Sequence, residues 1–551
     1  MAKMTTGQAV IESLVAQGVD TVFGIISIHT LHLYDALKTA VEGGRLKFVG
    51  ARHEHALTFM ADGYSRVTGK PGVLLTSSGP GAADSIGAMG ESYHSSVPLL
   101  QITTEIESEW LGKGLGVTHE AKHQLEMFES VTDWRSLTPS VEEVPNQIAE
   151  AFDHLRTNHP RPAVLEIPTD YFSKESDFEI IPARTPAGPP LDAASLREAA
   201  ELLRSAARPL VLAGAGVSRS DANAELIELA ELLDIPVAVA DGGKGAFPDD
   251  HPLGLGSALG QRIWHDNPVQ EYIGTCDVVM VVGSSLPFRT TAGVQLKLPE
   301  KLIHVDVDPA VFGRNFPVKV GLPGDAKHVL RQLIDAVGDG STGQGQTPGG
   351  ERRDAIAALK QRTRAGLEEQ LPNELRLWEG VRSAIGRDAI VICDSTVPAS
   401  SATRCLPVYE PRSFHGPHGW VSIGYGFPAS LGAKAGVPDR QVLCVTGDGG
   451  FQYNLQELGS AVQHGLAPIV LVFNDNAWGV LKGYQSTRMD DRFFATDLTN
   501  PDFETLAAAY GIDYALVRTT DELTSTLERI GNPSKITLVE AAVPDGIANF
   551  T

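Results

Sequence analysis

Acidic residues and glycines gather where two consecutive predicted strands end. The stretch 447–451 (GDGGF) follows the apolar run 442–446, and the stretch 474–477 (NDNA) follows the apolar run 469–473. Glycines placed directly after a strand let backbone N–H groups approach an anion at a helix N-terminus. Carboxylate oxygens are suitable ligands for Mg²⁺ or Ca²⁺ bridged to a diphosphate. Because open α/β sheets bind ligands at the carboxyl ends of their strands, we expect a metal and phosphate site here.

The composition limits the class of protein. The chain has 551 residues, with 45 Lys and Arg against 68 Asp and Glu, and a formal net charge of −23. This acidity argues against a nucleic-acid-binding face, which needs a basic surface. The longest apolar runs, such as 278–282, have the length of strands and are too short to span a membrane. Since the chain starts without a basic and apolar leader and its four cysteines show no CxxC spacing, we expect a cytoplasmic protein without a zinc site.

Three α/β blocks follow one another along the chain. Short apolar runs alternate with stretches at helical spacing, which is typical of parallel sheets covered on both faces. The Pro-rich stretch 182–189 and the Gly-rich stretch 338–350 have the composition of linkers. A weak echo also relates 60–81 to 428–450, since both read as helix, short strand and Gly-rich turn.

The fold class we predict is α/β, with three doubly wound parallel-sheet domains. Their expected bounds are 1–182, 191–336 and 356–551, with a flexible linker at 337–355. Buried strands are expected at 21–24, 46–49, 73–76, 99–103, 163–167, 209–213, 235–240, 278–282, 302–307, 390–393, 442–446, 469–473 and 536–540.

The two acidic turns also carry a family fingerprint. A GDG turn followed at a set distance by NN or ND is typical of thiamine diphosphate-dependent enzymes of the acetohydroxyacid synthase and pyruvate decarboxylase superfamily, and this chain resembles them. The resemblance implies thiamine diphosphate with Mg²⁺ or Ca²⁺, held by the carboxylates of Asp448 and Asp475 and the backbone carbonyl of Ala477. It also implies cofactor contacts from residues that follow three of the strands, namely Gly447, Gly449, Gly450, Ser395, Thr396 and Asn474.

A second match lies in the N-terminal block. The stretches 52–56 (RHEHA), 60–66 (MADGYSR) and 76–81 (TSSGPG) resemble the pyrimidine-binding domain of the same family. The resemblance makes Glu54 the glutamate that hydrogen-bonds N1′ of the aminopyrimidine. A carboxyl group that shares a proton with N1′ favours the imino tautomer, whose 4′-nitrogen removes the weakly acidic C2 proton of the thiazolium. Burial should raise the pKa of this glutamate, so that it carries that proton near neutral pH.

A third match is the glycine-framed stretch 416–426 (GPHGWVSIGYG). By resemblance, Ile423 is the bulky residue that wedges between the two cofactor rings, and the Val421 carbonyl accepts from the 4′-amino group. The central block matches at 244–248 (KGAFP) and 250–253 (DHPL), so the resemblance covers nearly the whole chain. FAD or ADP in the central block is compatible with the family, although no residue here points to either.

The residues expected to face the substrate depart from the common patterns. Ile28 stands where decarboxylases have a polar group, which resembles 2-hydroxyacyl-CoA lyases, and His29 resembles benzaldehyde lyase or is a structural histidine. Glu120 falls where acetohydroxyacid synthases have a catalytic glutamine, and its pairing with His119 resembles 2-ketoarginine decarboxylase-like proteins. Tyr484 replaces the Trp that selects the second substrate in acetohydroxyacid synthases. The candidate catalytic residues are therefore Glu54, Ile28, His29, His119 and Glu120.

The resemblance implies an enzyme that cleaves or forms a C–C bond of a 2-oxo acid, by decarboxylation or carboligation in the manner of acetolactate synthase. A 2-hydroxyacyl-CoA lyase, an acyloin lyase resembling benzaldehyde lyase and a non-catalytic paralogue stay open as alternatives. An NAD-dependent oxidoreductase is weakly indicated by the run 214–216 (GAG), although no complete GxGxxG follows. As partners we expect a 2-oxo acid or 2-hydroxyacyl-CoA substrate and further copies of the chain, in a homodimer or homotetramer with the active site between subunits.

Overall fold

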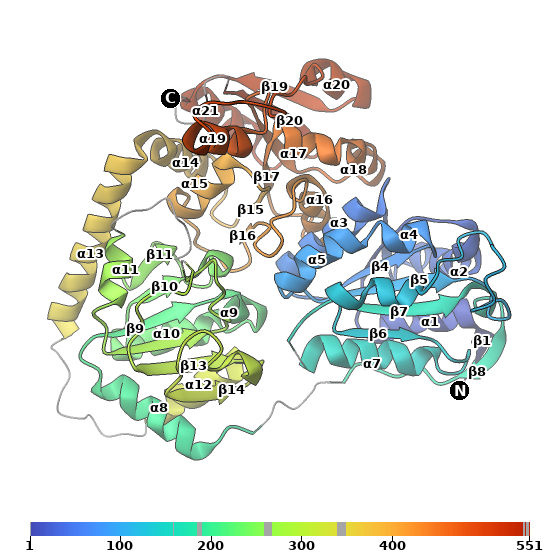
Figure 1. The fold of residues 1–551 in the computed structure, drawn as a ribbon, viewed down its shortest axis with the longest axis horizontal. Coiled ribbons are helices and arrows are strands. Elements are labelled where there is room, and N and C mark those ends of the chain that lie inside the picture. Colours follow the sequence, from blue (N-terminus) through green and yellow to red (C-terminus); the bar gives the residue numbers. More distant parts are fainter. Residues whose placement is uncertain are drawn as a thin grey trace.

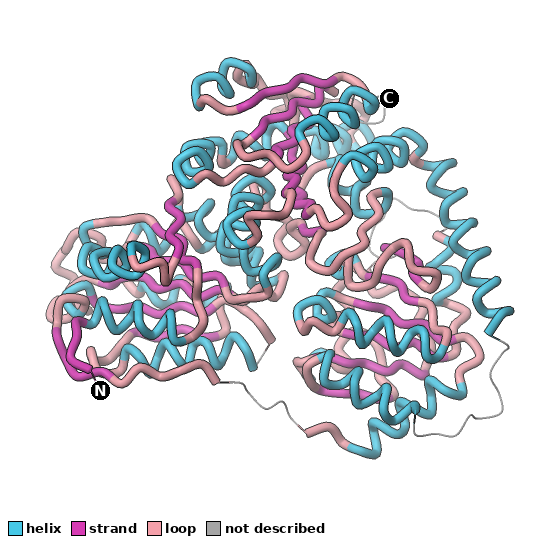
Figure 2. Tube along the Cα trace, turned by 180° about the vertical axis from the view of Figure 1, so that it is seen from behind, coloured by secondary structure: helices cyan, strands magenta, loops and turns pink. Residues whose placement is uncertain are grey.

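Three parallel sheets with helices packed against them build the chain, as Figure 1 shows. The computed structural model describes residues 2–157, 159–184, 190–257, 267–291, 293–338, 349–543, 546 and 550. The predicted α/β class with three parallel-sheet domains is confirmed. In both Figure 1 and Figure 2, the C-terminal domain lies above the N-terminal and central domains.

The N-terminal sheet has the strand order β3-β2-β4-β5-β7-β6, and all its strand pairs are parallel. Strands β1 and β8 form a separate antiparallel pair, which contacts helix α1. The strands are β1 Ala2–Thr5, β2 Thr21–Gly24, β3 Lys47–Gly50, β4 Gly72–Thr76, β5 Leu99–Glu105, β6 Trp134–Leu137, β7 Ala163–Pro168 and β8 Glu175–Phe178. The helices are α1 Thr6–Ala16, α2 Leu31–Glu42, α3 Glu54–Thr68, α4 Pro80–Ala83, α5 Ile86–His94, α6 Gln124–Met127 and α7 Val144–Thr157.

The central sheet has the order β11-β10-β9-β12-β13-β14 and is parallel throughout. Its strands are β9 Pro209–Ala213, β10 Val237–Val239, β11 Gly254–Ser257, β12 Val278–Val282, β13 Lys301–Asp306 and β14 Val320–Pro323. Its helices are α8 Ala193–Ser205, α9 Ala215–Arg219, α10 Asn223–Leu233, α11 Pro268–Ile273 and α12 Ala326–Gly338.

The C-terminal sheet has the order β16-β15-β17-β18-β20-β19. Its strands are β15 Ile390–Cys393, β16 Phe414–His415, β17 Val442–Gly447, β18 Ile469–Asn474, β19 Asp513–Val517 and β20 Thr537–Ala542. Its helices are α13 Gly349–Gln370, α14 Pro372–Ala384, α15 Val397–Cys405, α16 Gly426–Gly436, α17 Asp448–Tyr453, α18 Leu458–His464, α19 Gly479–Arg488, α20 Phe503–Tyr510 and α21 Thr520–Ile530. Numbered from its own first parallel strand, each of the two outer domains has the same strand order, so the echo between 60–81 and 428–450 reflects a shared topology.

The expected linkers fall partly outside the described residues. Residues 185–189 and 339–348 are not described, whereas 349–355, expected as linker, form the start of α13. Ile356 and Leu359 of α13 pack in the central core, and Leu367 further along packs in the C-terminal core. Helix α13 therefore joins the two cores, and Figure 1 shows it rising along the outer side of the central domain. Among the described residues, no helix is both long and apolar enough to cross a membrane.

Helices α3 and α16 join the N-terminal and C-terminal domains through reciprocal glycine contacts. A Cβ atom at Gly63 would lie 2.0 Å from the carbonyl oxygen of Ala429, and one at Gly432 would lie 1.8 Å from the carbonyl oxygen of Met60. Only glycine fits at either position, because the backbones of the two helices touch there. Helix α3 of the N-terminal domain and helix α16 of the C-terminal domain therefore pack backbone against backbone.

The same two helices run parallel. The ring of Phe59, within α3, packs edge to face at 5.2 Å against Tyr425, which directly precedes α16, and Gly436 at the end of α16 lies against Thr68 and Tyr64 of α3. Their N-termini therefore lie at the same end of the interface. The loop 416–425 before α16 runs along α3, since the carbonyl of Gly416 accepts from Arg66 in the last turn of α3 at 3.1 Å.

We expect Gly63→Ala to lower the free energy of unfolding by about 3 kcal/mol, since the added methyl group collides with a backbone carbonyl that cannot move aside. The matched control is Gly483→Ala on the exposed face of α19, where a Cβ would meet nothing within 4 Å. That change should be neutral or stabilise by about 0.5–1 kcal/mol, because alanine has the higher helix propensity. Urea unfolding of both variants measures the difference, and equal stabilities would contradict the backbone contact.

Candidate active site

Asp448 begins helix α17 directly after strand β17. Its side chain is 1% exposed, and its Oδ2 accepts a hydrogen bond of 2.6 Å from Nδ2 of Asn500. Burial raises the pKa of Asp448, although the Asn500 bond acts in the opposite direction. A buried carboxylate at a helix start, where backbone N–H groups are unpaired, is a suitable ligand for a cation that also holds an anion.

Asp475 follows the neighbouring strand β18 and faces Asp448. Burial and the charge of Asp448 raise the pKa of Asp475 to about 6. Its Oδ1 accepts from the N–H of Ala477 at 3.1 Å, which closes a tight turn. A Cβ at Gly479 would lie 2.4 Å from Oδ2 of Asp475, so only glycine leaves room for this carboxylate. Two carboxylates this close repel each other, and a divalent cation between them would remove that repulsion.

Asn474 and Asn500 surround the carboxylate pair. Asn474 donates from Nδ2 to Oε1 of Glu540 at 2.7 Å, and its Oδ1 accepts from Nδ2 of Asn500 at 2.8 Å. Asn474 therefore points its oxygen towards Asn500 and serves as a support for the turn. Asn500 was not predicted from the sequence, because it lies in a loop with no periodic or glycine pattern around it.

The turn after strand β15 has the features of a phosphate site. Thr396 precedes helix α15, and within the described part of the chain its buried hydroxyl has no hydrogen-bond partner. A Cβ at Gly447, after the next strand, would lie 3.8 Å from Cβ of Thr396, so the two turns adjoin. Ser395 lies between Thr396 and the buried Asp394, and it donates its N–H to Oδ1 of Asp394 at 2.6 Å.

The donor set fits a diphosphate and a divalent cation. The unpaired Thr396 hydroxyl, the start of α15 and the start of α17 offer hydrogen-bond donors beside the Asp448 and Asp475 carboxylates. Gly450 contacts Asp394, whereas Gly449 is covered by the Trp478 ring, which a Cβ there would meet at 2.6 Å. A hollow of about 210 Å³ lies at this point, lined by Gly449, Gln452, Tyr453, Trp478 and Leu498.

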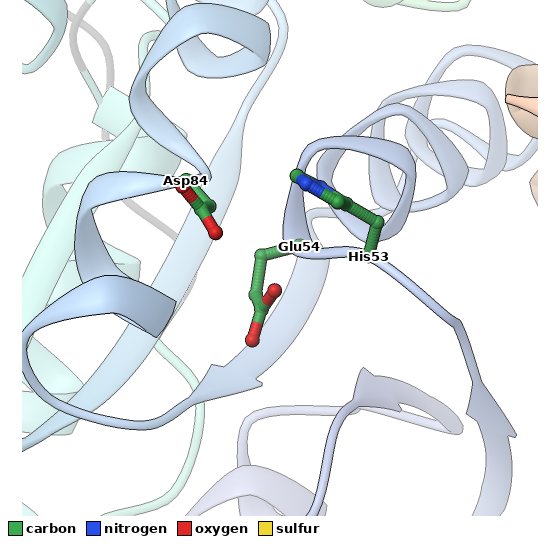
Figure 3. A group of neighbouring side chains, drawn as sticks. All are labelled: His53, Glu54 and Asp84. Atoms are coloured by element: carbon green, nitrogen blue, oxygen red, sulfur yellow. The ribbon is translucent and has the colours of Figure 1, made fainter. Parts of the chain in front are cut away.

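Glu54 begins helix α3 in the N-terminal domain, and Figure 3 shows it beside His53 and Asp84. A Cβ at Gly81 would lie 3.2 Å from its Oε1. Burial raises the pKa of Glu54, and the nearby charge of Asp84 raises it further. The direction is the one that a carboxyl group needs in order to hold a proton near neutral pH. Single ligand atoms of the three side chains lie within 4.8 Å of one another.

The loop 416–425 carries the two predicted ring contacts. Val421 has a φ of 59°, in the left-handed region that a β-branched residue rarely adopts. Val421 and Ile423 are each 36% exposed, although both are apolar. Gly424 and Gly426 donate their N–H groups to the two oxygens of Asp394 at 3.1 and 3.2 Å. The loop is thus held in one strained shape that leaves both apolar side chains open for contact.

His29 and His119 lie together around Ser77, a residue that sequence reasoning did not single out. The Ser77 Oγ lies 3.4 Å from Nδ1 of His29 and 3.2 Å from Nδ1 of His119. The two imidazole rings pack at a centroid distance of 4.5 Å. Burial and the neighbouring His119 lower the pKa of His29, so this ring is neutral at pH 7. We call these three residues the His–Ser–His cluster.

The other two catalytic candidates lie apart from this cluster's hydrogen bonds. Ile28 is 70% exposed, and Oε2 of Glu120 accepts from the N–H groups of residues 116 and 117 of its own loop at 2.7 and 3.0 Å. Glu107 is near the cluster, because its charge raises the pKa of His29 against the effect of burial. Within the described residues, Oε2 of Glu107 is buried without a hydrogen-bond partner.

Comparison with known proteins covers all three domains. Residues 4–129 match the model of the thiamine pyrophosphate enzyme N-terminal TPP binding domain, 196–333 that of the central domain, and 396–541 that of the C-terminal TPP binding domain.

Relatives match over nearly their full length. The chain is 36% identical over 541 residues to a protein of Pseudomonas aeruginosa named "Probable 2-ketoarginine decarboxylase", covering 98% of this chain and 94% of that protein. It is 31% identical to a "Probable acetolactate synthase large subunit" of Methanocaldococcus jannaschii, covering 95% and 89% of the two chains. It is 30% identical to the "Acetolactate synthase large subunit" of Corynebacterium glutamicum, covering 96% and 84%. The chain therefore belongs to the thiamine pyrophosphate-dependent enzymes, within the superfamily of acetohydroxyacid synthases and decarboxylases.

Proposed function

We propose that this thiamine diphosphate-dependent enzyme decarboxylates a 2-oxo acid whose side chain carries a positive charge. The observation that carries the substrate class is the buried carboxylate oxygen of Glu107 that has no partner among the described residues, on a side chain whose charge acts on His29 of the His–Ser–His cluster. A buried carboxylate oxygen without a donor is costly, and a substrate guanidinium or ammonium group supplies donors. The relative named a 2-ketoarginine decarboxylase supports the same class.

In this proposal, Mg²⁺ or Ca²⁺ is bound by the carboxylates of Asp448 and Asp475 and the backbone carbonyl of Ala477. The diphosphate takes the donors of Thr396 and of the two helix starts. When bound, the thiazolium supplies the carbon nucleophile that attacks the 2-oxo carbonyl and accepts the electron pair released with CO₂. The Val421 carbonyl and the Ile423 side chain orient the two cofactor rings.

Glu54 and the His–Ser–His cluster handle protons. The raised pKa of Glu54 suits it to hold a proton on N1′ of the pyrimidine. His29 is neutral at pH 7, so it can accept a hydrogen bond from Ser77 while Ser77 remains in reach of His119. We propose that this cluster hydrogen-bonds the substrate carboxylate and relays a proton taken up from solvent to the carbon that loses CO₂, so that one solvent proton is consumed for each aldehyde released.

We also propose that a second copy of the chain completes the site. The contacts that the structure gives the Glu54 carboxyl come from its own N-terminal domain. Large apolar side chains are exposed in both the N-terminal and the C-terminal domain, with Ile28 70% and Phe494 84% exposed. Such side chains are suited to an interface between subunits. A homodimer, or a homotetramer built from two dimers, would bury them.

Carboligation in the manner of acetolactate synthase is the second candidate function, favoured by the two relatives of that name. The lyase alternatives rest on Ile28, an apolar residue where decarboxylases have a polar one, and on His29. Product analysis with a panel of 2-oxo acids, acyloins and 2-hydroxyacyl-CoAs separates these reactions. Decarboxylation of a 2-oxo acid gives an aldehyde, carboligation gives a 2-hydroxy-2-alkyl acid or an acyloin, and a lyase cleaves an acyloin to two aldehydes or a 2-hydroxyacyl-CoA to an aldehyde and formyl-CoA.

We expect Glu107→Gln to lower kcat/KM for 2-oxo-5-guanidinovalerate about 10- to 100-fold, since a charge-assisted hydrogen bond is lost. The kcat/KM for uncharged 2-oxovalerate should change less than about twofold, because that substrate makes no such bond. Glu109→Gln, at an exposed glutamate two positions further along, is the matched control and should affect neither substrate. An equal loss with both substrates would contradict the assignment of Glu107 to the cationic group.

Glu54→Gln should slow proton–deuterium exchange at the thiazolium C2 by about 100-fold or more, since an amide cannot share a proton with N1′ in the same way. Cofactor affinity should change little, because the diphosphate and the metal contribute most of the binding. Nuclear magnetic resonance of quenched samples measures the exchange. Unchanged exchange in the variant would remove Glu54 from the proton transfer.

The two aspartates should respond differently to removal of charge. Asp475→Asn should weaken Mg²⁺ binding only about 10-fold or less, because a neutral amide oxygen still ligates the ion at this half-buried position. Asp448→Asn should weaken it by about 100-fold or more, since the remaining carboxylate is less well placed for the diphosphate. Calorimetric titration of Mg²⁺ in the presence of thiamine diphosphate measures both. Equal losses would give Asp475 a role beyond ligation, and no loss with Asp475→Asn would remove it from the ligand set.

A further inference from the structure

Glu91 on helix α5 of the N-terminal domain receives a run of backbone hydrogen bonds from the C-terminal domain. Its side chain is fully buried. Its Oε1 accepts from the N–H groups of residues 418 and 419, both at 2.9 Å, and its Oε2 accepts from those of residues 420 and 421, also at 2.9 Å. The Ser95 hydroxyl donates to Oε1 at 2.7 Å. The N–H of Ser422 follows at 3.5 Å from Oε2, so five consecutive amides face one carboxylate, in the arrangement of an anion-binding nest.

Two glycines make this close approach possible. A Cβ at Gly419 would lie 2.5 Å from Cβ of His94, and a Cβ at Gly90 would lie 2.3 Å from the Trp420 ring. Helix α5 and the loop 416–425 are therefore in contact on both sides of the carboxylate. Both domains contribute to this contact. The N-terminal domain provides Gly90 and the Glu91 carboxylate, and the C-terminal domain provides Gly419.

A second buried carboxylate holds the other end of the loop. Asp394, in the C-terminal domain itself, accepts from the N–H groups of Gly424 and Gly426. The short segment between the two carboxylates contains Val421, with its left-handed φ of 59°, and Ile423. Two buried carboxylates thus hold the backbone conformation of this segment, Asp394 from its own domain and Glu91 from the N-terminal domain.

We propose that Glu91 is a positioning residue that fixes the cofactor-facing segment 421–423 from the N-terminal domain, an inference that rests on the proposed function of that segment. Glu91 does not touch the reacting atoms. It holds Val421 in a strained backbone conformation, so that the Val421 carbonyl and the Ile423 side chain stay at fixed places whether or not the cofactor is bound.

A reciprocal contact supports this reading. Glu457, at the start of α18 in the C-terminal domain, accepts from the N–H of Arg52 with both oxygens, at 3.0 and 3.1 Å. Ser460 donates to Glu457 at 2.6 Å, as Ser95 does to Glu91. Arg52 lies two residues before Glu54. Glu91 of the N-terminal domain therefore holds the loop that precedes α16, and Glu457 of the C-terminal domain holds the stretch that precedes α3.

The chemistry of the contact defines the variant that breaks it. Every group that the structure places at hydrogen-bond distance from the Glu91 oxygens is a donor, so an ionised carboxylate with two acceptor oxygens matches them. Glu91→Gln has nearly the same shape, but its NH₂ group would face N–H groups. Glu91→Asp keeps both acceptor oxygens on a side chain that is shorter by one methylene group. Glu166→Gln is the control, because Glu166 is also buried in the N-terminal domain and lies away from the loop, bonded to Gln124.

Hydrogen–deuterium exchange of the peptide 416–426 in the full-length chain without cofactor tests the contact directly. Glu91→Gln should speed amide exchange in this peptide about tenfold or more, whereas Glu91→Asp should speed it less and Glu166→Gln should leave it unchanged. Gly419→Ala, which pushes the loop from α5 without removing the charge, provides a second variant should Glu91→Gln fail to fold, and it should also speed exchange. Equal acceleration by Glu91→Gln and Glu91→Asp, or no acceleration in the folded variants, would overturn the proposal.

Cofactor measurements then separate this proposal from the proposed function. In Glu91→Gln we expect thiamine diphosphate to bind within about threefold of its normal affinity and C2 proton exchange to slow at least about tenfold, since the diphosphate site is intact and the rings are not held. Faster amide exchange with normal C2 exchange would overturn the positioning role. If the unaltered chain binds no thiamine diphosphate while amide protection still depends on Glu91, the proposed function is wrong. The role of Glu91 in holding the loop 416–425 is then still supported.

Discussion

The contact between helices α3 and α16 is the constraint on which the rest of the structure depends. Gly63 and Gly432 each touch a backbone carbonyl of the opposite helix, so the two helices lie closer than any larger side chain would allow. The same interface brings the loop 416–425 against α3 and α5, and the stretch before Glu54 against the start of α18. The buried carboxylates Glu91 and Glu457 then fix each loop from the opposite domain.

Charge is distributed so that the proposed cofactor meets complementary groups. At the carboxyl ends of β17 and β18, Asp448 and Asp475 repel each other, and burial and this repulsion raise the pKa of Asp475 to about 6. After β15, by contrast, the buried Thr396 hydroxyl has no hydrogen-bond partner among the residues that the structure describes. A divalent cation would remove the repulsion between the two aspartates, and an anion bound with it would accept from the Thr396 hydroxyl. A metal diphosphate therefore fits the site better than either ion alone.

Much of this was predictable from the sequence, and the exceptions have physical reasons. Apolar runs predicted the inner strands and the edge strand β3, whereas the edge strands β6, β11, β14, β16 and β19 and the two-stranded sheet of β1 and β8 were missed, since pairing on one side relaxes the need for apolar residues. Local motifs gave Glu54, Asp448 and Asp475 because a strand end fixes their place. Ser77, Glu91 and Asn500 were missed because their role comes from contacts with segments distant in sequence, such as 418–421 for Glu91.

The central claim is that Glu54 of one chain and Asp448 of a second chain serve one active site. Mixing two inactive variants, Glu54→Gln and Asp448→Asn, after subunit exchange tests it directly. If each site takes its N-terminal domain from one chain and its C-terminal domain from the other, every mixed dimer has one intact site, and random mixing should restore about a quarter of the normal activity. If both residues of a site come from the same chain, no intact site forms, and a mixture that stays inactive although mixed dimers are present would contradict the account.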